Sequence, residues 1–92
     1  GMGGLPAIEE QMTKMLEKGP GRISPFFIPM VITNLASGQI SIHHNLKGPN
    51  YSVTSACASG AHSLGEAYNY IRFGTCDIMI AGGTESTVCP LA

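Results

Sequence analysis

Charged side chains are scarce in this chain, and their scarcity limits what it can fold into on its own. Only 12% of the 92 residues are Asp, Glu, Lys or Arg, about half the ~25% of a typical soluble domain. A domain of this size buries only ~60–65% of its unfolded surface, so polar side chains must cover the rest. We therefore expect a fragment from the interior of a larger domain, which fits the start at Gly1 and the apolar end at Ala92.

The charge balance and the cysteines argue against several classes of protein. A net charge of −1 offers no electrostatic footprint for nucleic acid or for an anionic membrane. No apolar run approaches the ~20 residues of a membrane-spanning helix, so we predict no nucleic-acid partner and no membrane span. The three cysteines, Cys57, Cys76 and Cys89, lack CxxC spacing, which favours a reducing compartment over a disulfide scaffold or a zinc site. We predict no metal site and no cofactor.

The first part of the chain has the signals of a helix. Pro6 suits the first turn of a helix, and the carboxylates of Glu9 and Glu10 favour its positive end. Gly19-Pro20-Gly21 ends it. Four apolar residues have the spacing of one buried face: Ile8, Met12, Met15 and Leu16.

A second helix is expected to begin at Pro29, after an apolar connection over residues 23–29 that is broken by prolines. It should end before the turn signal Lys47-Gly48-Pro49-Asn50. The residues expected along one side are Val31, Leu35, Gly38 and Ile42.

The second half predicts a strand, a helix and a strand. Tyr51 to Thr54 forms a short strand, and residues 77–81 form an apolar strand of the kind buried on both sides. The helix between them ends at Gly74. It should carry Ala61, Leu64, Tyr68 and Ile71 on one face. The fold class is therefore α/β, with a parallel crossover around Cys57.

Cys57 lies at the predicted strand-to-helix turn, which is the position where open α/β sheets bind ligands. The helix N-terminus there favours thiolate over thiol. The backbone N–H of Cys57 is placed to stabilise an oxyanion on a thioester carbonyl attacked by its sulfur. Small neighbours, including Ala56, leave room for a substrate. Free cysteine is also a common core residue, so spacing alone leaves that alternative open.

Several separated motifs resemble one family, in the family's order. Ser55 to His62 is similar to the Thr/Ser-Ala-Cys-x-Ser-Gly-x-His run of the elongating β-ketoacyl-acyl-carrier-protein synthases of dissociated fatty acid synthesis. Further matches extend the resemblance over essentially the whole chain: Gly3-Gly4, residues 24–29, Asn34, Gly38, residues 46–49 and residues 77–85. The pattern looks closest to the synthase II type. The resemblance implies part of the N-terminal half of a thiolase-like layered α-β-α-β-α fold, residues 1–92 being an incomplete ketosynthase domain.

The resemblance also implies a chemistry and its residues. Cys57 would take an acyl chain from acyl carrier protein, and malonyl-carrier protein would then decarboxylate and condense with it. The histidines and lysine of the decarboxylation step come later in the family. Met2, Phe27 and Ala56 would line the acyl pocket, although core packing explains Met2 and Phe27 equally well. Arg22 would meet the acidic carrier protein or would simply be solvated.

In the family the strand before the cysteine pairs across a two-fold axis, so a homodimer through Tyr51 to Thr54 is implied. His62 would point ~140° away from Cys57 on a helix, which favours a structural role in the core. His43 and His44 should cap a helix end or lie at the surface. Gly82-Gly83-Thr84-Glu85 lacks a phosphate-loop pattern, so we interpret it as a tight backbone crossing behind the active site.

The sequence leaves three hypotheses for the parent protein. The parent is a condensing enzyme of fatty acid synthesis, a thiolase or polyketide ketosynthase relative, or a non-catalytic remnant or interaction protein. We expect the cytoplasm of a bacterium, or a mitochondrial or plastid matrix if a transit peptide lies upstream. The 92 residues alone are expected to fold poorly and to condense nothing.

Overall fold

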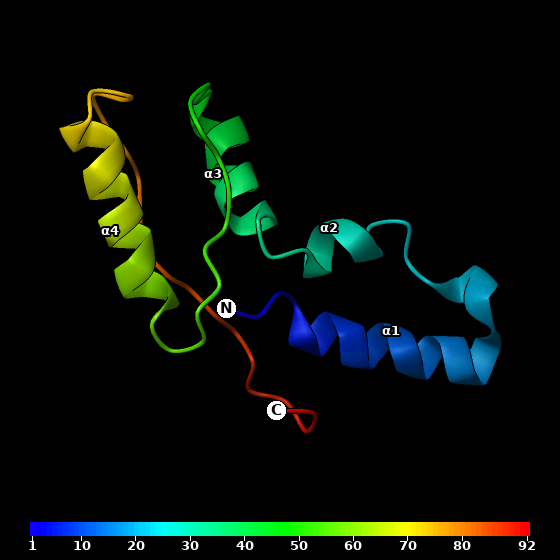
Figure 1. Cartoon of the computed structure of the whole chain (residues 1–92). Coiled ribbons are helices and arrows are strands. Elements are labelled where there is room, and N and C mark those ends of the chain that lie inside the picture. Colours follow the sequence, from blue (N-terminus) through cyan, green and yellow to red (C-terminus); the bar gives the residue numbers. More distant parts are fainter.

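The computed structural model describes residues 1–92, and it is entirely helical in its regular structure (Figure 1). Four α-helices and one 3₁₀ turn follow one another: α1 (Leu5–Lys18), η1 (Pro20–Arg22), α2 (Phe27–Val31), α3 (Leu35–His44) and α4 (Ser59–Arg72). Helix α1 packs against η1 and α2, and α2 packs against α3, whereas α4 packs against none of the other helices. None of the helices combines the length and the apolar character of a membrane-spanning segment.

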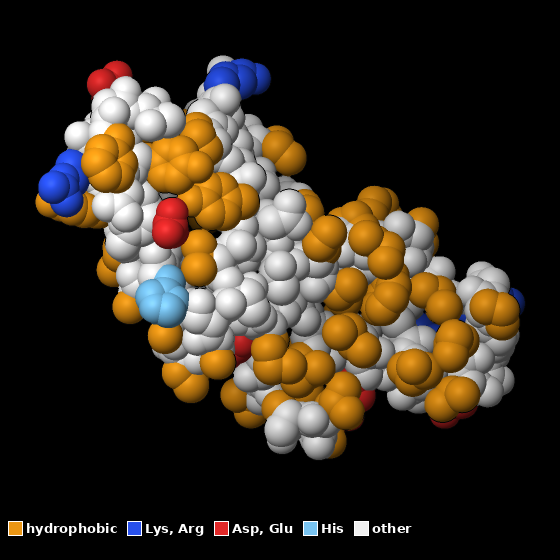
Figure 2. Space-filling model, viewed as in Figure 1, with side chains coloured by type: hydrophobic (Ala, Val, Ile, Leu, Met, Phe, Trp, Pro, Cys, Tyr) orange, Lys and Arg blue, Asp and Glu red, His pale blue; other side chains and the backbone are white.

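The molecule is open and elongated. Its extents are 52 × 27 × 14 Å and its radius of gyration is 15.9 Å, whereas a compact domain of this length has a radius of about 12 Å. Only four of the 92 residues are buried: Leu5, Gln11, Ser59 and Ala67. Hydrophobic side chains consequently cover much of the visible face (Figure 2).

Helix α1 has the predicted ends but not all of the predicted face. Pro6 lies in its first turn, and Gly19 ends it with a φ of 83° that glycine adopts readily. Leu16 is 77% exposed, and Met12 is also exposed, so the prediction that both are buried is wrong. Gln11 is buried in their place because its side-chain oxygen accepts a hydrogen bond from Ser24 N–H at 2.7 Å. Glu10 lies beyond the first turn and pairs with Lys14 at 2.8 Å.

The predicted second helix is two helices. Phe27 begins α2, so Pro29 lies inside its first turn, and the chain becomes extended at Ile32 before α3 begins at Leu35. Three β-branched residues in a row, Val31-Ile32-Thr33, favour this break.

Gly3 and Gly4 pack directly on the backbone at this break. A β-carbon at Gly3 would clash with the carbonyl oxygen of Val31, and one at Gly4 would clash with that of Met30. Only glycine permits so close an approach of two backbones. The end of α3 is as predicted, because Asn45 takes a left-handed φ of 53° just before residues 46–50.

The predicted strands are extended but unpaired. Residues 51–54 and 77–81 form no sheet, and the one isolated bridge in the structure joins Ser55 to Cys57. The sheet of the α/β prediction is therefore not seen in this chain. Helix α4 ends as predicted at Gly74, with a φ of 75°, but its expected buried face is exposed. The exposed residues are Ala61, Leu64, Tyr68 and Ile71.

Candidate nucleophile turn

Cys57 is a central residue of the sharp turn between the extended segment 51–54 and α4. Ala56, just before it, has a φ of 48°, in the left-handed region that residues with a side chain rarely adopt. Two backbone hydrogen bonds close the turn, from Ala58 N–H to Ser55 O at 3.0 Å and from Ser59 N–H to Ala56 O at 3.1 Å. The cysteine is a free thiol and is exposed. The turn therefore holds the sulfur at the surface rather than in a core.

The hydroxyl of Ser59 spans the same turn. It accepts a hydrogen bond from Ser55 N–H at 2.8 Å and donates one to Ala56 O at 2.7 Å. Ser59 is buried, one of only four residues in the chain that are. The Ser59 hydroxyl thus binds the backbone on both sides of the left-handed residue Ala56, at the Ser55 N–H and at the Ala56 carbonyl.

The backbone N–H groups of Ala56 and Cys57 have no hydrogen-bond partner in the chain. The N–H of Cys57 makes no hydrogen bond to any other group of the chain, and no side chain caps the first turn of α4. An uncapped helix N-terminus carries partial positive charge and unpaired N–H groups. The arrangement can stabilise negative charge on an oxygen that develops next to the sulfur.

Three segments that are far apart in the sequence meet behind this turn. A β-carbon at Gly1 would lie 3.1 Å from Ser59 Oγ, and one at Gly83 would lie 3.1 Å from the Cα of Gly60. The contact between Gly83 and Gly60 confirms the predicted tight backbone crossing. Glu85 ties the segments together, because its Oε1 accepts a hydrogen bond from Met2 N–H at 2.9 Å.

None of the three histidines makes a hydrogen bond with Cys57. His62 Nδ1 is 2.7 Å from Ser55 Oγ, so the ring has a hydrogen-bonding partner, but it is exposed rather than in the core as predicted. His43 and His44 occupy the last turn of α3, are exposed, and contact each other edge to face with their ring centroids 4.8 Å apart. No three His, Cys, Asp or Glu side chains converge as metal ligands.

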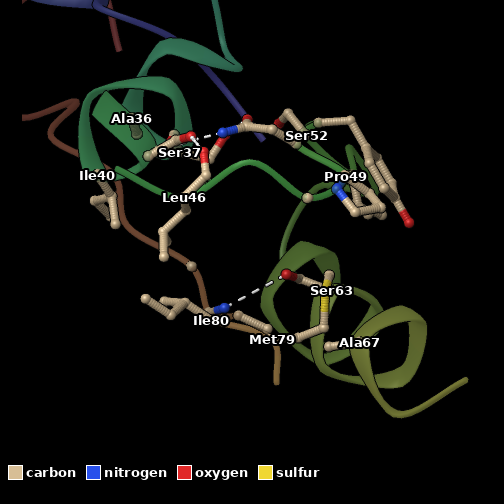
Figure 3. Close-up of a pocket in the computed structure, with 18 of the residues that line it drawn as sticks. Ala36, Ser37, Ile40, Leu46, Pro49, Ser52, Ser63, Ala67, Met79 and Ile80 are labelled. Atoms are coloured by element: carbon tan, nitrogen blue, oxygen red, sulfur yellow. Dashed lines mark hydrogen bonds between the residues drawn. The ribbon is translucent and has the colours of Figure 1, made fainter. Parts of the chain in front are cut away.

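A cleft of about 620 Å³ opens beside the turn (Figure 3). Its walls come mainly from five places: residues 1–2, α3, residues 46–53, α4 and residues 76–84. Figure 3 shows side chains of α3, such as Ile40, on one side and those of α4, such as Ala67, on the other, with Ile80 of the extended segment near them. Ser63 of α4 accepts a hydrogen bond from Gly82 N–H at 3.4 Å. The two unpaired extended segments therefore flank one apolar gap.

The predicted acyl-pocket residues do not share one cavity in this chain. Met2 is exposed and lines the cleft of about 620 Å³, where neither Cys57 nor Ala56 contributes to the wall. Phe27 lines a separate cavity of about 100 Å³, together with residues of α1 and Ile23. Ala56 adjoins Cys57 directly, through the left-handed turn.

The predicted docking and pairing residues are both at the surface. Arg22 is exposed in η1 and has no acidic partner. In the expected dimer segment, Tyr51 donates a hydrogen bond to Glu66 Oε2 at 3.4 Å, and its ring lies 6.1 Å from that of Tyr70. Loss of water around the phenol, with added effects of Tyr70 and Glu66, raises the pKa of Tyr51 to about 12.

Sequence reasoning gave no role to two residues that support the turn. Ser59 belongs to the motif around Cys57, and Glu85 to the glycine-rich stretch that follows the second extended segment. Their partners are backbone groups brought near by turn geometry and by a contact across 83 residues. A small polar residue two places after a candidate nucleophile, at a helix start, was the available signal for Ser59.

Comparison with known proteins gives one consistent family. Residues 1–92 match the family model "Beta-ketoacyl synthase, N-terminal domain". The chain is similar to the 3-oxoacyl-[acyl-carrier-protein] synthase 2 of Rhizobium meliloti, with 52% identity over 92 residues, and to that of Coxiella burnetii, with 50% over 91 residues. The protein of the same name from Synechocystis sp. is 47% identical over 92 residues.

These matches cover 99–100% of this chain but only 22% of each of the three relatives. The chain thus spans about a fifth of the length of the curated relatives it matches. The matching domain has the thiolase-like fold. Because the family model is matched from the first residue to the last, the chain belongs to the beta-ketoacyl synthase family.

Proposed function

We propose that the parent of this chain is a 3-oxoacyl-acyl-carrier-protein synthase of fatty acid biosynthesis and that Cys57 is its nucleophile. The observation that carries the proposal is the turn at Cys57. An exposed free thiol, an unpaired N–H on the same residue and an uncapped helix start converge there. Curated relatives with 45–52% identity carry the name 3-oxoacyl-[acyl-carrier-protein] synthase 2.

The first half-reaction of the parent is an acyl transfer to Cys57. The Cys57 thiolate attacks the carbonyl carbon of an acyl thioester on the carrier protein, and a carbon–sulfur bond forms. The carbonyl oxygen takes the negative charge, next to the free N–H of Cys57. The intermediate collapses with loss of the carrier thiolate, which takes up a proton, and the acyl chain remains on Cys57 as a thioester.

The second half-reaction needs groups that lie outside this chain. Malonyl-carrier protein loses carbon dioxide, and the resulting carbanion attacks the carbonyl carbon of the Cys57 thioester. The carbon–sulfur bond breaks, the Cys57 thiolate leaves, and the product is a 3-oxoacyl chain on the carrier protein that is two carbons longer. The His62 ring already binds Ser55 Oγ, and His43 and His44 lie at the end of α3. None of the three is placed to assist decarboxylation, so this step belongs to the remainder of the parent.

Residues 1–92 are then an incomplete N-terminal ketosynthase domain. The finer architecture, a layered α-β-α-β-α arrangement, follows if residues 51–54 and 77–81 become sheet strands in the parent. Their extended conformation and the apolar cleft between them support this proposal. The isolated chain corresponds to the non-catalytic interpretation, because it has only four buried residues and no decarboxylating groups.

Three further assignments belong to the same proposal. Met2, Phe27 and Ala56 line the acyl pocket once the rest of the domain brings their cavities together. Arg22 docks the acidic carrier protein, which its exposure and its lack of an acidic partner support. Residues 51–54 pair across the two-fold axis of a homodimer, which their unpaired backbone supports.

The test is to incubate the full-length parent with a long-chain acyl-carrier thioester and to map the acylated peptide by mass spectrometry. We expect one acyl group on Cys57, and none in Cys57→Ser. Cys76→Ser and Cys89→Ser are matched controls, because both thiols are partly buried and lie outside the turn; both variants should acylate normally. An adduct on Cys76 or Cys89, or none at all, would overturn the assignment.

A further inference from the structure

We propose that Ser59 is a positioning residue for Cys57, and that its hydroxyl holds Ala56 in the left-handed conformation that presents the sulfur. The proposal rests on the proposed function of Cys57. Ser59 itself touches no reacting atom; it acts through the backbone of Ser55 and Ala56.

The hydrogen-bond geometry singles out this hydroxyl. Ser59 Oγ accepts from Ser55 N–H at 2.8 Å, and that N–H has no other partner in the chain. The same hydroxyl donates to Ala56 O at 2.7 Å. One oxygen therefore joins the N–H before the strained residue to the carbonyl of the strained residue itself. An alternative conformation of Ala56 would break both bonds together.

The two hydrogen bonds of Ser59 stabilise a backbone conformation at Ala56 that is otherwise unfavourable. A residue with a β-carbon is disfavoured at a φ of 48°, and such conformations persist only where the surroundings over-determine them. Residues 51–54 are unpaired here, so no sheet constrains the turn from that side. The constraint comes from Ser59, from two backbone bonds and from His62 Nδ1, which lies 2.7 Å from Ser55 Oγ.

The surroundings of Ser59 are also built to hold it in place. It is buried, and a β-carbon at Gly1 would lie only 3.1 Å from its Oγ. The neighbouring Gly60 lies against Gly83 in the close backbone crossing. The hydroxyl therefore has little freedom to turn toward other partners.

The test uses the full-length parent and three variants. Ser59→Ala removes the hydroxyl and Ser59→Thr keeps it. Ser86→Ala is the matched control, because Ser86 is exposed and does not line the cleft. Two rates are measured: single-turnover acylation by an acyl-carrier thioester, and alkylation of Cys57 by iodoacetamide as a function of pH.

We expect Ser59→Ala to lower the maximal acylation rate roughly ten- to hundredfold, because a misplaced nucleophile loses its near-attack geometry. The half-saturating concentration of the thioester should stay unchanged. The pH dependence of the rate at which iodoacetamide alkylates Cys57 should differ from that of the wild type. Ser59→Thr should recover most of the rate, and Ser86→Ala should match the wild type. A purely structural role would instead lower the melting temperature while leaving the rate of the folded fraction intact, and that result would overturn the proposal.

Amide hydrogen exchange in the wild-type parent keeps the proposal testable if Ser59→Ala does not fold. The Ser55 amide should be protected by its bond to Ser59 Oγ, whereas the Cys57 amide should exchange rapidly. Equal exchange at the two positions would refute the role of Ser59. Failure of the proposed function is distinguishable from both results, because Cys57 would then not be acylated even in the wild type.

Discussion

Excision of residues 1–92 from the parent should abolish cooperative folding. The accessible surface of the chain is 6780 Å² for a mass of 9.6 kDa, whereas a compact monomer of that mass exposes about 5,100 Å². The excess is thus about 1,700 Å², of which roughly 1,000 Å² is apolar if the usual share of ~55–60% holds. At ~25 cal/mol per Å², the isolated chain lacks on the order of 20 kcal/mol of the hydrophobic stabilisation that a compact monomer of this mass would have.

That loss exceeds the whole net stability of a typical domain, which is about 5–15 kcal/mol. The large apolar side chains left in water include Ile78, which is 83% exposed, and Phe73, which is 73% exposed. We therefore expect the isolated chain to aggregate, or to bind hydrophobic dyes while giving a broad, non-cooperative thermal transition. It should also condense nothing when given acyl- and malonyl-carrier thioesters.

The assay compares the isolated chain with the parent by calorimetry, circular dichroism and analytical ultracentrifugation at matched concentration. A monomeric preparation that melts in one transition, with equal calorimetric and van't Hoff enthalpies, would refute the area argument.

Three further outcomes follow from single contacts, each measured in the parent. Gly3→Ala should lower stability by about 1–3 kcal/mol, because its β-carbon would clash with the Val31 carbonyl oxygen; a melting temperature equal to that of Gly21→Ala, where nothing lies within 4 Å, would contradict this. Glu85→Ala should cost about 1 kcal/mol in denaturant unfolding, because Met2 N–H loses its acceptor. Glu85→Gln should retain most of that stability, and Glu17→Ala is the exposed control. In an ultraviolet titration the phenol of Tyr51 should ionise near pH 12 rather than near pH 10. Its contribution to stability is then fully present below pH 10 and is lost as the pH rises through about 12; Tyr51→Phe should remove the late step, and a titration unchanged by that substitution would refute it.

The sequence predicted the ends of helices better than their faces. Helix ends depend on local backbone preferences, as at Pro6, Gly19 and Gly74, so they can be predicted without knowledge of the fold. Burial depends on what covers a helix. Leu16 of α1 and the apolar face of α4 are exposed because nothing in this chain packs on them.

The errors near the site have a similar cause. The break at Ile32 accompanies the packing of Gly3 and Gly4 on a segment nearly thirty residues away, which no local pattern reveals. Residues 51–54 and 77–81 do not pair with each other in this chain, and both segments contribute to the walls of the cleft instead. Cys57 could be found from its motif. The role of Ser59 depends on the left-handed φ of Ala56, and a left-handed φ cannot be predicted from the sequence at an alanine.

The turn at Cys57 is made almost wholly of short-range contacts. The bonds that shape it join Ser55 to Ala58, Ser55 to Ser59 and Ala56 to Ser59, none of them spanning more than four residues. Closing such small loops costs little chain entropy, and contacts of this kind form early in folding. The turn can therefore take shape on the nascent polypeptide as soon as α4 has emerged from the ribosome, before residues 77–81 have emerged.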